Sequence, residues 1–182
     1  MIWLVLGVLL WAYSHLMKRL TPGFRAGLGN GLGKGVATVL TVLALIAMIY
    51  GYRHADYVQV WQPPTFLRHV NNLLMLIAVV LLNIGYSRGV MRTWLRHPML
   101  TAVLFWSVAH LLVNGDLASL ELFGGIGIWA MIDMLAINRM EPAWVRPAAG
   151  PFRNDVIYIA ASLVLFVLIV AIHTWLGYPP FG

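Results

Sequence analysis

Long apolar runs separated by short polar stretches dominate the pattern of this chain. Six runs can be drawn, and they cover roughly Ile2–Leu20, Gly35–Tyr52, Val70–Tyr86, His97–Val113, Leu117–Ile137 and Val156–Leu176. Each has about 17–21 residues, enough for a helix to cross a hydrocarbon layer of about 30 Å. A transmembrane β-barrel would instead show alternating segments of about ten residues. The pattern predicts an all-α integral membrane protein with about six transmembrane helices, forming one domain over residues 1–182.

Composition supports this class. Of the 182 residues, 61% are hydrophobic and 10% are charged, whereas soluble domains have roughly 45–50% apolar and about 25% charged residues. The net charge of +6 does not indicate nucleic acid, because the basic residues are spread between the apolar runs. No cysteine is present, which excludes disulfides and thiolate ligands. The expected partner is the lipid bilayer, and the sequence leaves protein partners open.

Lysine and arginine predict the orientation. Lys18 and Arg19 follow the first apolar run rather than precede it, so we expect a retained span and not a cleaved signal peptide. Ten of the twelve basic residues fall in the first, third and fifth loops: Lys18, Arg19, Arg25, Lys34, Arg88, Arg92, Arg96, Arg139, Arg146 and Arg153. Because basic loops stay in the cytoplasm, we expect these loops inside and both the N-terminus and the C-terminus outside.

The loops carry their own signals. The first contains "GLGNGLGKG", which fits no phosphate-binding pattern in register, so we expect a flexible turn. The fourth connection, "NGD", is typical of a tight turn. The fifth loop holds three prolines and cannot be a continuous helix.

Ionisable side chains inside the spans are the candidates for function, because lipid penalises them. They are His15, His110, Asp133 and His173. Asp133 is expected to pair with an arginine such as Arg139 or Arg96. His173 and the remaining histidines, His54, His69 and His97, are predicted near the membrane interfaces. On the pattern alone, the interfacial interpretation is favoured for His15, and the functional interpretation is favoured for His110.

His97 and His110 cannot share one metal ion. They are thirteen residues apart on one predicted helix, which corresponds to roughly 20 Å of rise and about 220° of rotation. His110 instead shares a helix face with Trp106, Ser107 and Asn114, at i−4, i−3 and i+4. This polar and aromatic face is expected to point into the bundle.

Two histidines inside a bundle suit haem better than zinc. Structural zinc normally requires four ligands, whereas a bis-histidine haem needs two imidazoles from two helices and a large apolar pocket. Nine methionines and many aromatic residues could line such a pocket. The alternative is a purely structural bundle in which His110 is only hydrogen-bonded.

Several motifs in order resemble the NnrU family, bacterial membrane proteins related to plant ζ-carotene isomerase. They are "SHLMKRL" in the first run, "YVQVWQPP" after the second, and "RHP", "AH" and "NGD" around the fourth. The resemblance covers essentially the whole chain and implies a polytopic helical protein of the bacterial inner membrane. It also implies haem b, with the ligand pair falling on His15 and His110.

Two features of the residues bear on that ligand pair. The plant branch has a cysteine three residues before the second ligand, where this chain has Ser107, and a hydroxyl oxygen is a poor substitute for a thiolate on haem iron. His15 and His110 also differ in predicted depth by roughly 12 Å. On depth alone, His110 would sooner pair with His173 or His69.

The resemblance implies two functions of different class. One is a redox-dependent cis-trans isomerase of an apolar polyene. The other is a non-enzymatic haem protein that supports nitrite and nitric oxide respiration, in denitrification, by maturation or sensing. A membrane methyltransferase is a weaker alternative, because "RHPM" has no convincing downstream motif after Asp116.

Overall fold

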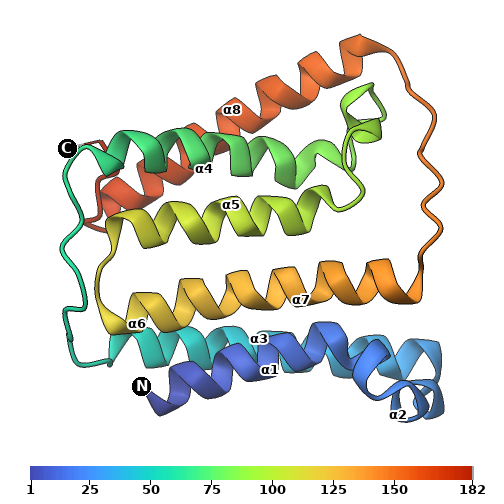
Figure 1. Cartoon of the computed structure of the whole chain (residues 1–182), viewed down its shortest axis with the longest axis horizontal. Coiled ribbons are helices and arrows are strands. Elements are labelled where there is room, and N and C mark those ends of the chain that lie inside the picture. Colours follow the sequence, from blue (N-terminus) through green and yellow to red (C-terminus); the bar gives the residue numbers. More distant parts are fainter. Residues whose placement is uncertain (182) are drawn as a thin grey trace.

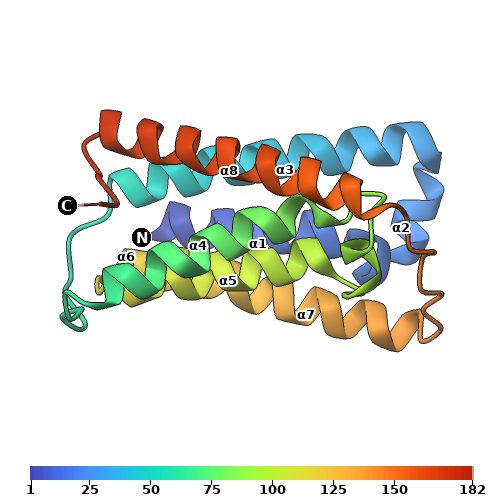
Figure 2. The same cartoon turned by 90° about the horizontal axis from the view of Figure 1, so that it is seen from above.

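The computed structural model describes residues 1–181 and shows six long helical segments lying side by side (Figures 1 and 2). The elements are α1 (Ile2–Leu20), α2 (Pro22–Gly27), α3 (Gly29–Arg53), α4 (Leu67–Ile84), η1 (Met91–Thr93), α5 (Pro98–Val113), α6 (Leu117–Ser119), η2 (Leu120–Gly124), α7 (Gly125–Met140) and α8 (Phe152–Trp175). Within these residues the β pairing is limited to one isolated bridge between Gln59 and Asp116. The prediction of an all-α chain is confirmed.

Four of these segments are long and apolar enough to cross a membrane: α3, α4, the continuous segment Leu117–Met140 and α8. α5 has the same apolar character but only 16 residues. α1 has 19 residues and carries Lys18 and Arg19 in its last turn, and it is not among the four. Every predicted run is therefore helical. Only four of the six helical segments meet the length and hydropathy expected of a membrane-spanning helix.

The glycine-rich stretch of the first loop is helical, so the prediction of a flexible turn is wrong. α2 begins with Pro22 in its first turn, and α3 begins at Gly29, six residues before the predicted start. Gly29 has a φ of +68°, which allows the bend between the two helices. Arg25 donates to the Gly29 carbonyl at 2.9 Å and covers Gly33. The break in the proline-rich fifth loop is confirmed, whereas residues 114–116 form a short extended connection rather than the predicted turn, with Asn114 and Asp116 both in extended backbone.

The helices form two groups. α1, α3 and α7 lie together, α4, α5 and α8 lie together, and α5 packs on α7 to join the groups (Figure 1). α1 and α3 pack tightly because each offers a glycine. A Cβ on Gly7 would lie 2.7 Å from the Met48 backbone nitrogen, and one on Gly51 would lie 2.4 Å from that of Leu4. Small residues that let backbones approach are typical of helix association in lipid.

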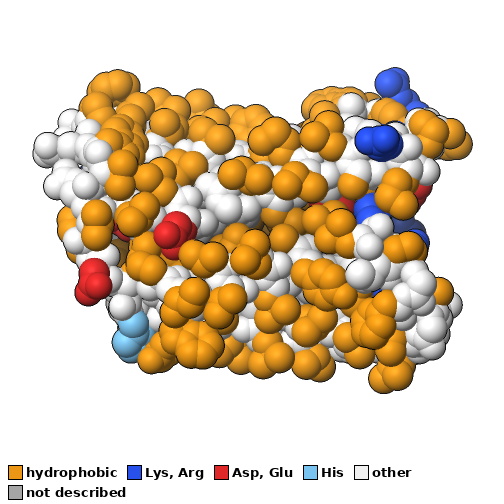
Figure 3. All heavy atoms as spheres, turned by 60° about the horizontal axis from the view of Figure 1, so that its bottom comes forward, with side chains coloured by type: hydrophobic (Ala, Val, Ile, Leu, Met, Phe, Trp, Pro, Cys, Tyr) orange, Lys and Arg blue, Asp and Glu red, His pale blue; other side chains and the backbone are white. Residues whose placement is uncertain are grey.

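Polar and apolar surfaces are separated along the bundle. Hydrophobic side chains cover most of the face seen in Figure 3, and lysines and arginines gather at one end. That end carries α2, the α4–α5 loop and the α7–α8 loop, and we call it the basic end. Both ends of the chain lie at the opposite end of the bundle (Figure 1).

Candidate functional site

His15 lies on α1 among indole rings. Its Nδ1 is 2.9 Å from the Trp11 carbonyl oxygen. Because a carbonyl oxygen only accepts, Nδ1 donates, and Nε2 of the neutral ring keeps a free lone pair. The ring centroid lies 4.5 Å from that of Trp11 and 4.8 Å from that of Trp129 on α7. His15 is thus directed into the bundle toward α7 rather than into the interface.

An ion pair lies one turn along α1 from His15. A guanidinium nitrogen of Arg19 is 3.1 Å from an oxygen of Asp133 on α7. The prediction that Asp133 pairs with an arginine is confirmed, but the partner is neither Arg139 nor Arg96, because α1 packs against α7 here and brings Arg19 to the carboxylate. Arg96 instead donates to the carbonyl oxygens of Glu141 and Pro142.

His110 has the same local arrangement on α5. Its Nδ1 is 2.9 Å from the Trp106 carbonyl oxygen and donates to it, so the lone pair of the neutral ring lies on Nε2. The ring stacks on Phe123 with centroids 4.5 Å apart and planes 27° apart, and lies 4.9 Å from Trp106. Asn114 is nearby, but its amide donates to the backbone carbonyl of His110 at 2.8 Å, not to the ring.

Ser107 faces α7 rather than the imidazole of His110. It is buried, and its Oγ donates to the Phe123 carbonyl oxygen at 2.5 Å. Phe123 belongs to the π-helical turn η2, where the i→i−4 bonding of the helix is interrupted. Gly127 permits this approach, since a Cβ there would lie 2.4 Å from Ser107 Oγ. Ser107 therefore anchors the turn that presents Phe123 to His110, a role that no spacing in the sequence indicates.

The rings of His15 and His110 belong to separate aromatic clusters. His15 packs on Trp129, whereas His110 packs on Phe123, six residues earlier on the same segment. Six helical residues rise about 9 Å, so the two rings differ in depth. Among the ring contacts of the described residues, none joins the two histidines. His69 is exposed, and His173 on α8 donates from Nδ1 to the Ile169 carbonyl oxygen of its own helix at 2.8 Å.

Two buried donors next to His15 lack partners. Nε1 of Trp11 and Nε1 of Trp129 are buried, with no acceptor among the described residues. A buried donor without a partner calls for an explanation, of which a bound water or a bound group is one. Within the described residues no group of three or more His, Cys, Asp or Glu could hold a metal ion. Any metal centre in the described part of the chain would therefore have at most two ligands of these residue types.

The motifs "VQVW" and "NGD" pair with each other at the end opposite the basic end. Val60 and Trp61 donate to the Gly115 carbonyl oxygen at 2.8 and 3.0 Å, and Leu117 donates to that of Val58 at 2.8 Å. A Cβ at Gly115 would lie 2.0 Å from the Trp61 carbonyl oxygen. These motifs therefore hold the second loop against the short connection that follows α5.

Taken together, these features define a helical membrane-type bundle that encloses two histidines among aromatic rings. The chain belongs to the NnrU family: the family model described as NnrU protein matches residues 3–180. No curated protein and no solved structure matches the chain.

Proposed function

We propose that this NnrU-family protein holds haem b in the membrane, with His15 and His110 as its ligands. The observation that carries the proposal is the hydrogen bonding of the two imidazole rings and their aromatic surroundings. Each donates Nδ1 to the carbonyl four residues earlier and keeps Nε2 free inside an aromatic environment. A hydrogen bond of this kind fixes the tautomer of a metal-binding histidine and raises its basicity. The unpaired indoles of Trp11 and Trp129 support a bound group beside His15.

All six long helical segments cross the bilayer in this proposal. The basic end carries ten of the twelve lysines and arginines, and the positive-inside rule favours a cytoplasmic position for it. The chain is then a multi-pass protein of the bacterial inner membrane, with both ends outside.

The proposed reaction is cis-trans isomerisation of an apolar polyene, by analogy with the plant relatives of the family. Bound haem iron would supply redox-dependent activation of a double bond. The chain's own residues shape the apolar surroundings: Trp106 and Phe123 cover His110, and Ser107 holds the turn that carries Phe123. No acid–base pair lies beside His110, because Ser107 and Asn114 both donate to backbone carbonyls. The rival function is a non-enzymatic haem protein of nitrite and nitric oxide respiration.

The test is an absorption spectrum of the full chain, produced with adequate haem and purified in detergent. The wild type is expected to show a Soret band that shifts on reduction, and His15→Ala and His110→Ala are expected to lose it or change its ligation. His54→Ala is the matched control, since His54 makes the same bond, 2.9 Å to the Tyr50 carbonyl, at an exposed site.

Each outcome has a definite meaning. A wild type without a Soret band contradicts haem binding. A normal spectrum for His15→Ala with a lost band for His173→Ala makes His173 the partner of His110. If the reduced, haem-loaded protein leaves a cis polyene unconverted, the isomerase assignment is wrong and the non-enzymatic function remains.

A further inference from the structure

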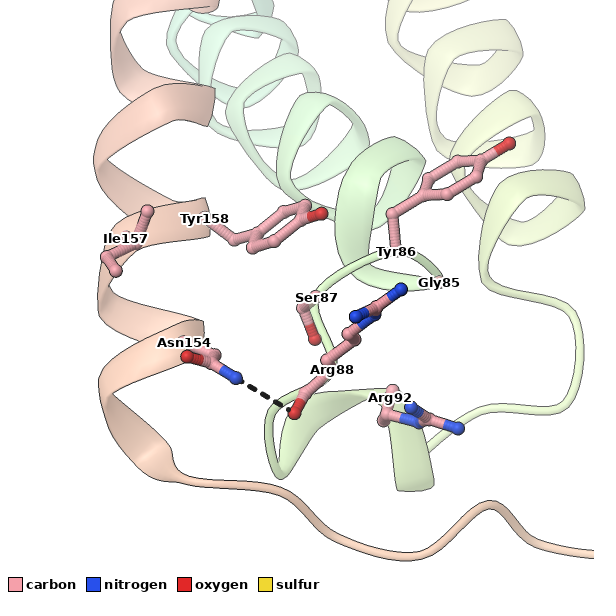
Figure 4. Close-up of a pocket in the computed structure, with 8 residues that line it drawn as sticks. All are labelled: Gly85, Tyr86, Ser87, Arg88, Arg92, Asn154, Ile157 and Tyr158. Atoms are coloured by element: carbon pink, nitrogen blue, oxygen red, sulfur yellow. Dashed lines mark hydrogen bonds between the residues drawn. The ribbon is translucent and has the colours of Figure 1, made fainter.

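A polar hollow opens at the basic end, away from both histidines of the proposed haem site. It has a volume of about 570 Å³ and lies between the α4–α5 loop and the first turns of α8 (Figure 4). Its lining includes Tyr86, Ser87, Arg88, Arg92, Asn154 and Tyr158. Two guanidinium groups and two phenols therefore border one space.

Neither arginine of this hollow is neutralised. Among the described residues the ion pairs are those of Arg19 with Asp133 and Glu141, and the side chains of Arg88 and Arg92 have no carboxylate partner. The nearby Asp155 is fully buried and is used by the backbone. It accepts from the amide of Val90 at 2.7 Å and from that of Met91 at 3.3 Å. The hollow is left with an excess of positive charge.

The loop that carries Arg88 is held in a strained conformation. Arg88 has a φ of +43°, in the left-handed region that non-glycine residues rarely adopt. Asn154 donates to its carbonyl at 3.2 Å, and the Gly150 amide donates to the Gly89 carbonyl at 3.0 Å. Figure 4 shows the Arg88 side chain between those of Tyr158 and Tyr86. Strain of this kind is concentrated at binding and catalytic sites.

Apolar side chains border the hollow on two sides. A second hollow shares Gly85 and Tyr86 with it and is lined by the apolar residues Pro98, Met99 and Leu100 together with Arg96 and His97. On α8, the exposed Ile157 is part of its lining. A cationic space bordered by exposed apolar helix is the environment of a lipid headgroup at a membrane surface.

We propose that this hollow binds the phosphate headgroup of an anionic phospholipid, with Arg88 and Arg92 as its cations and Asn154 and Tyr158 as its polar border. A soluble phosphate would need the same cations but not the apolar rim formed by Met99, Leu100 and Ile157. The proposal is independent of haem binding, because none of these residues contacts His15 or His110 in the described structure.

The test is native mass spectrometry of the full chain in detergent, titrated with phosphatidylglycerol, phosphatidylcholine or inorganic phosphate. One phosphatidylglycerol molecule is expected to bind at least about tenfold more tightly than phosphatidylcholine, since each arginine near an anionic lipid is worth roughly fivefold. Arg88→Gln/Arg92→Gln is expected to remove that preference. Arg139→Gln/Arg146→Gln, with the same loss of charge at exposed positions of the same end, is expected to keep it.

Three results would overturn the proposal: equal binding of both lipids, wild-type binding by the Arg88→Gln/Arg92→Gln variant, or displacement of the lipid by millimolar inorganic phosphate. The last would assign the hollow to a soluble anion. If the double variant does not fold, Arg92→Gln alone serves, with an expected loss of about fivefold in affinity for phosphatidylglycerol. Unchanged affinity in that folded single variant would count against the lipid site.

Discussion

At the scale of single residues, the bond from Nδ1 to a carbonyl does not by itself mark a functional histidine. His15, His110, His54 and His173 all make it to the residue four positions earlier, as the helix geometry allows. What distinguishes His15 and His110 is enclosure by rings from another segment, Trp129 in one case and Phe123 in the other. His54 stacks only on Tyr50 of its own helix and is exposed.

The Arg19–Asp133 pair yields a prediction at this scale. Asp133→Asn is expected to lower the free energy of unfolding by about 1–3 kcal/mol, because it leaves the largely buried Arg19 with only the exposed Glu141, 3.9 Å away. The side chains of Arg19 and Asp133 are 18% and 11% exposed. Arg19→Gln/Asp133→Asn should recover part of the loss. Thermal unfolding in detergent measures both, and additive losses in the double variant would show that the two side chains are not coupled.

Single residues also show where sequence reasoning stops. The charge of Asp133 inside an apolar run predicts a cationic partner, and the structure supplies one. Its identity depends on which helix packs against α7, and that information is tertiary. The nearest arginines along the chain were the natural candidates, but α1 brings Arg19 across from the first span.

At the scale of elements, the fifth apolar run contains the least expected feature. Leu117–Met140 is one uninterrupted helical segment, but it contains a π-helical turn at Leu120–Gly124. A π turn changes the direction of the side chains that follow it, and such turns are frequent at functional sites. Here it brings Phe123 onto His110 and exposes a carbonyl that Ser107 satisfies.

Ser107→Ala tests the role of this turn. Loss of the bond to the Phe123 carbonyl is expected to cost about 1–2 kcal/mol of unfolding free energy, since a buried acceptor is left unsatisfied. Ser162→Ala is the matched control, because Ser162 is equally buried but its Oγ has no partner in the described structure. That variant should be neutral or slightly stabilising. The same thermal unfolding assay compares them, and equal effects would contradict the anchoring role of Ser107.

Helix boundaries were predictable where they depend on the residue types at the boundary itself. Pro98 at the first turn of α5 and the prolines of the fifth loop mark boundaries that the structure keeps. The glycine-rich stretch was not predictable in this way, because glycine disfavours helix only by about 1 kcal/mol per residue. The glycine-rich stretch forms the first turns of α3, and this helix continues into a long apolar segment. Arg25 covers Gly33.

At the scale of the whole molecule, the odd-numbered loops meet at the basic end and both chain ends lie opposite (Figure 1). This arrangement follows from an even number of antiparallel long segments. It also gathers Arg88, Arg92 and Arg96 at one surface with Arg19 and Arg25. The charge asymmetry read along the chain is thus an asymmetry of the folded bundle, and each of the ten basic residues contributes to the same field.

That asymmetry predicts the orientation in the membrane. Alkaline phosphatase fused after Gly182 is expected to be active and green fluorescent protein fused there to be dark, because the positive-inside rule keeps the basic end in the cytoplasm. Insertion of each reporter into the α7–α8 loop at Ala148 should give the reverse. If the charges determine the orientation, then replacing Arg139, Arg146 and Arg153 with glutamine should weaken the difference between the reporters. Fluorescence from the fusion after Gly182, with an inactive phosphatase there, would place that end in the cytoplasm and contradict the six-span orientation.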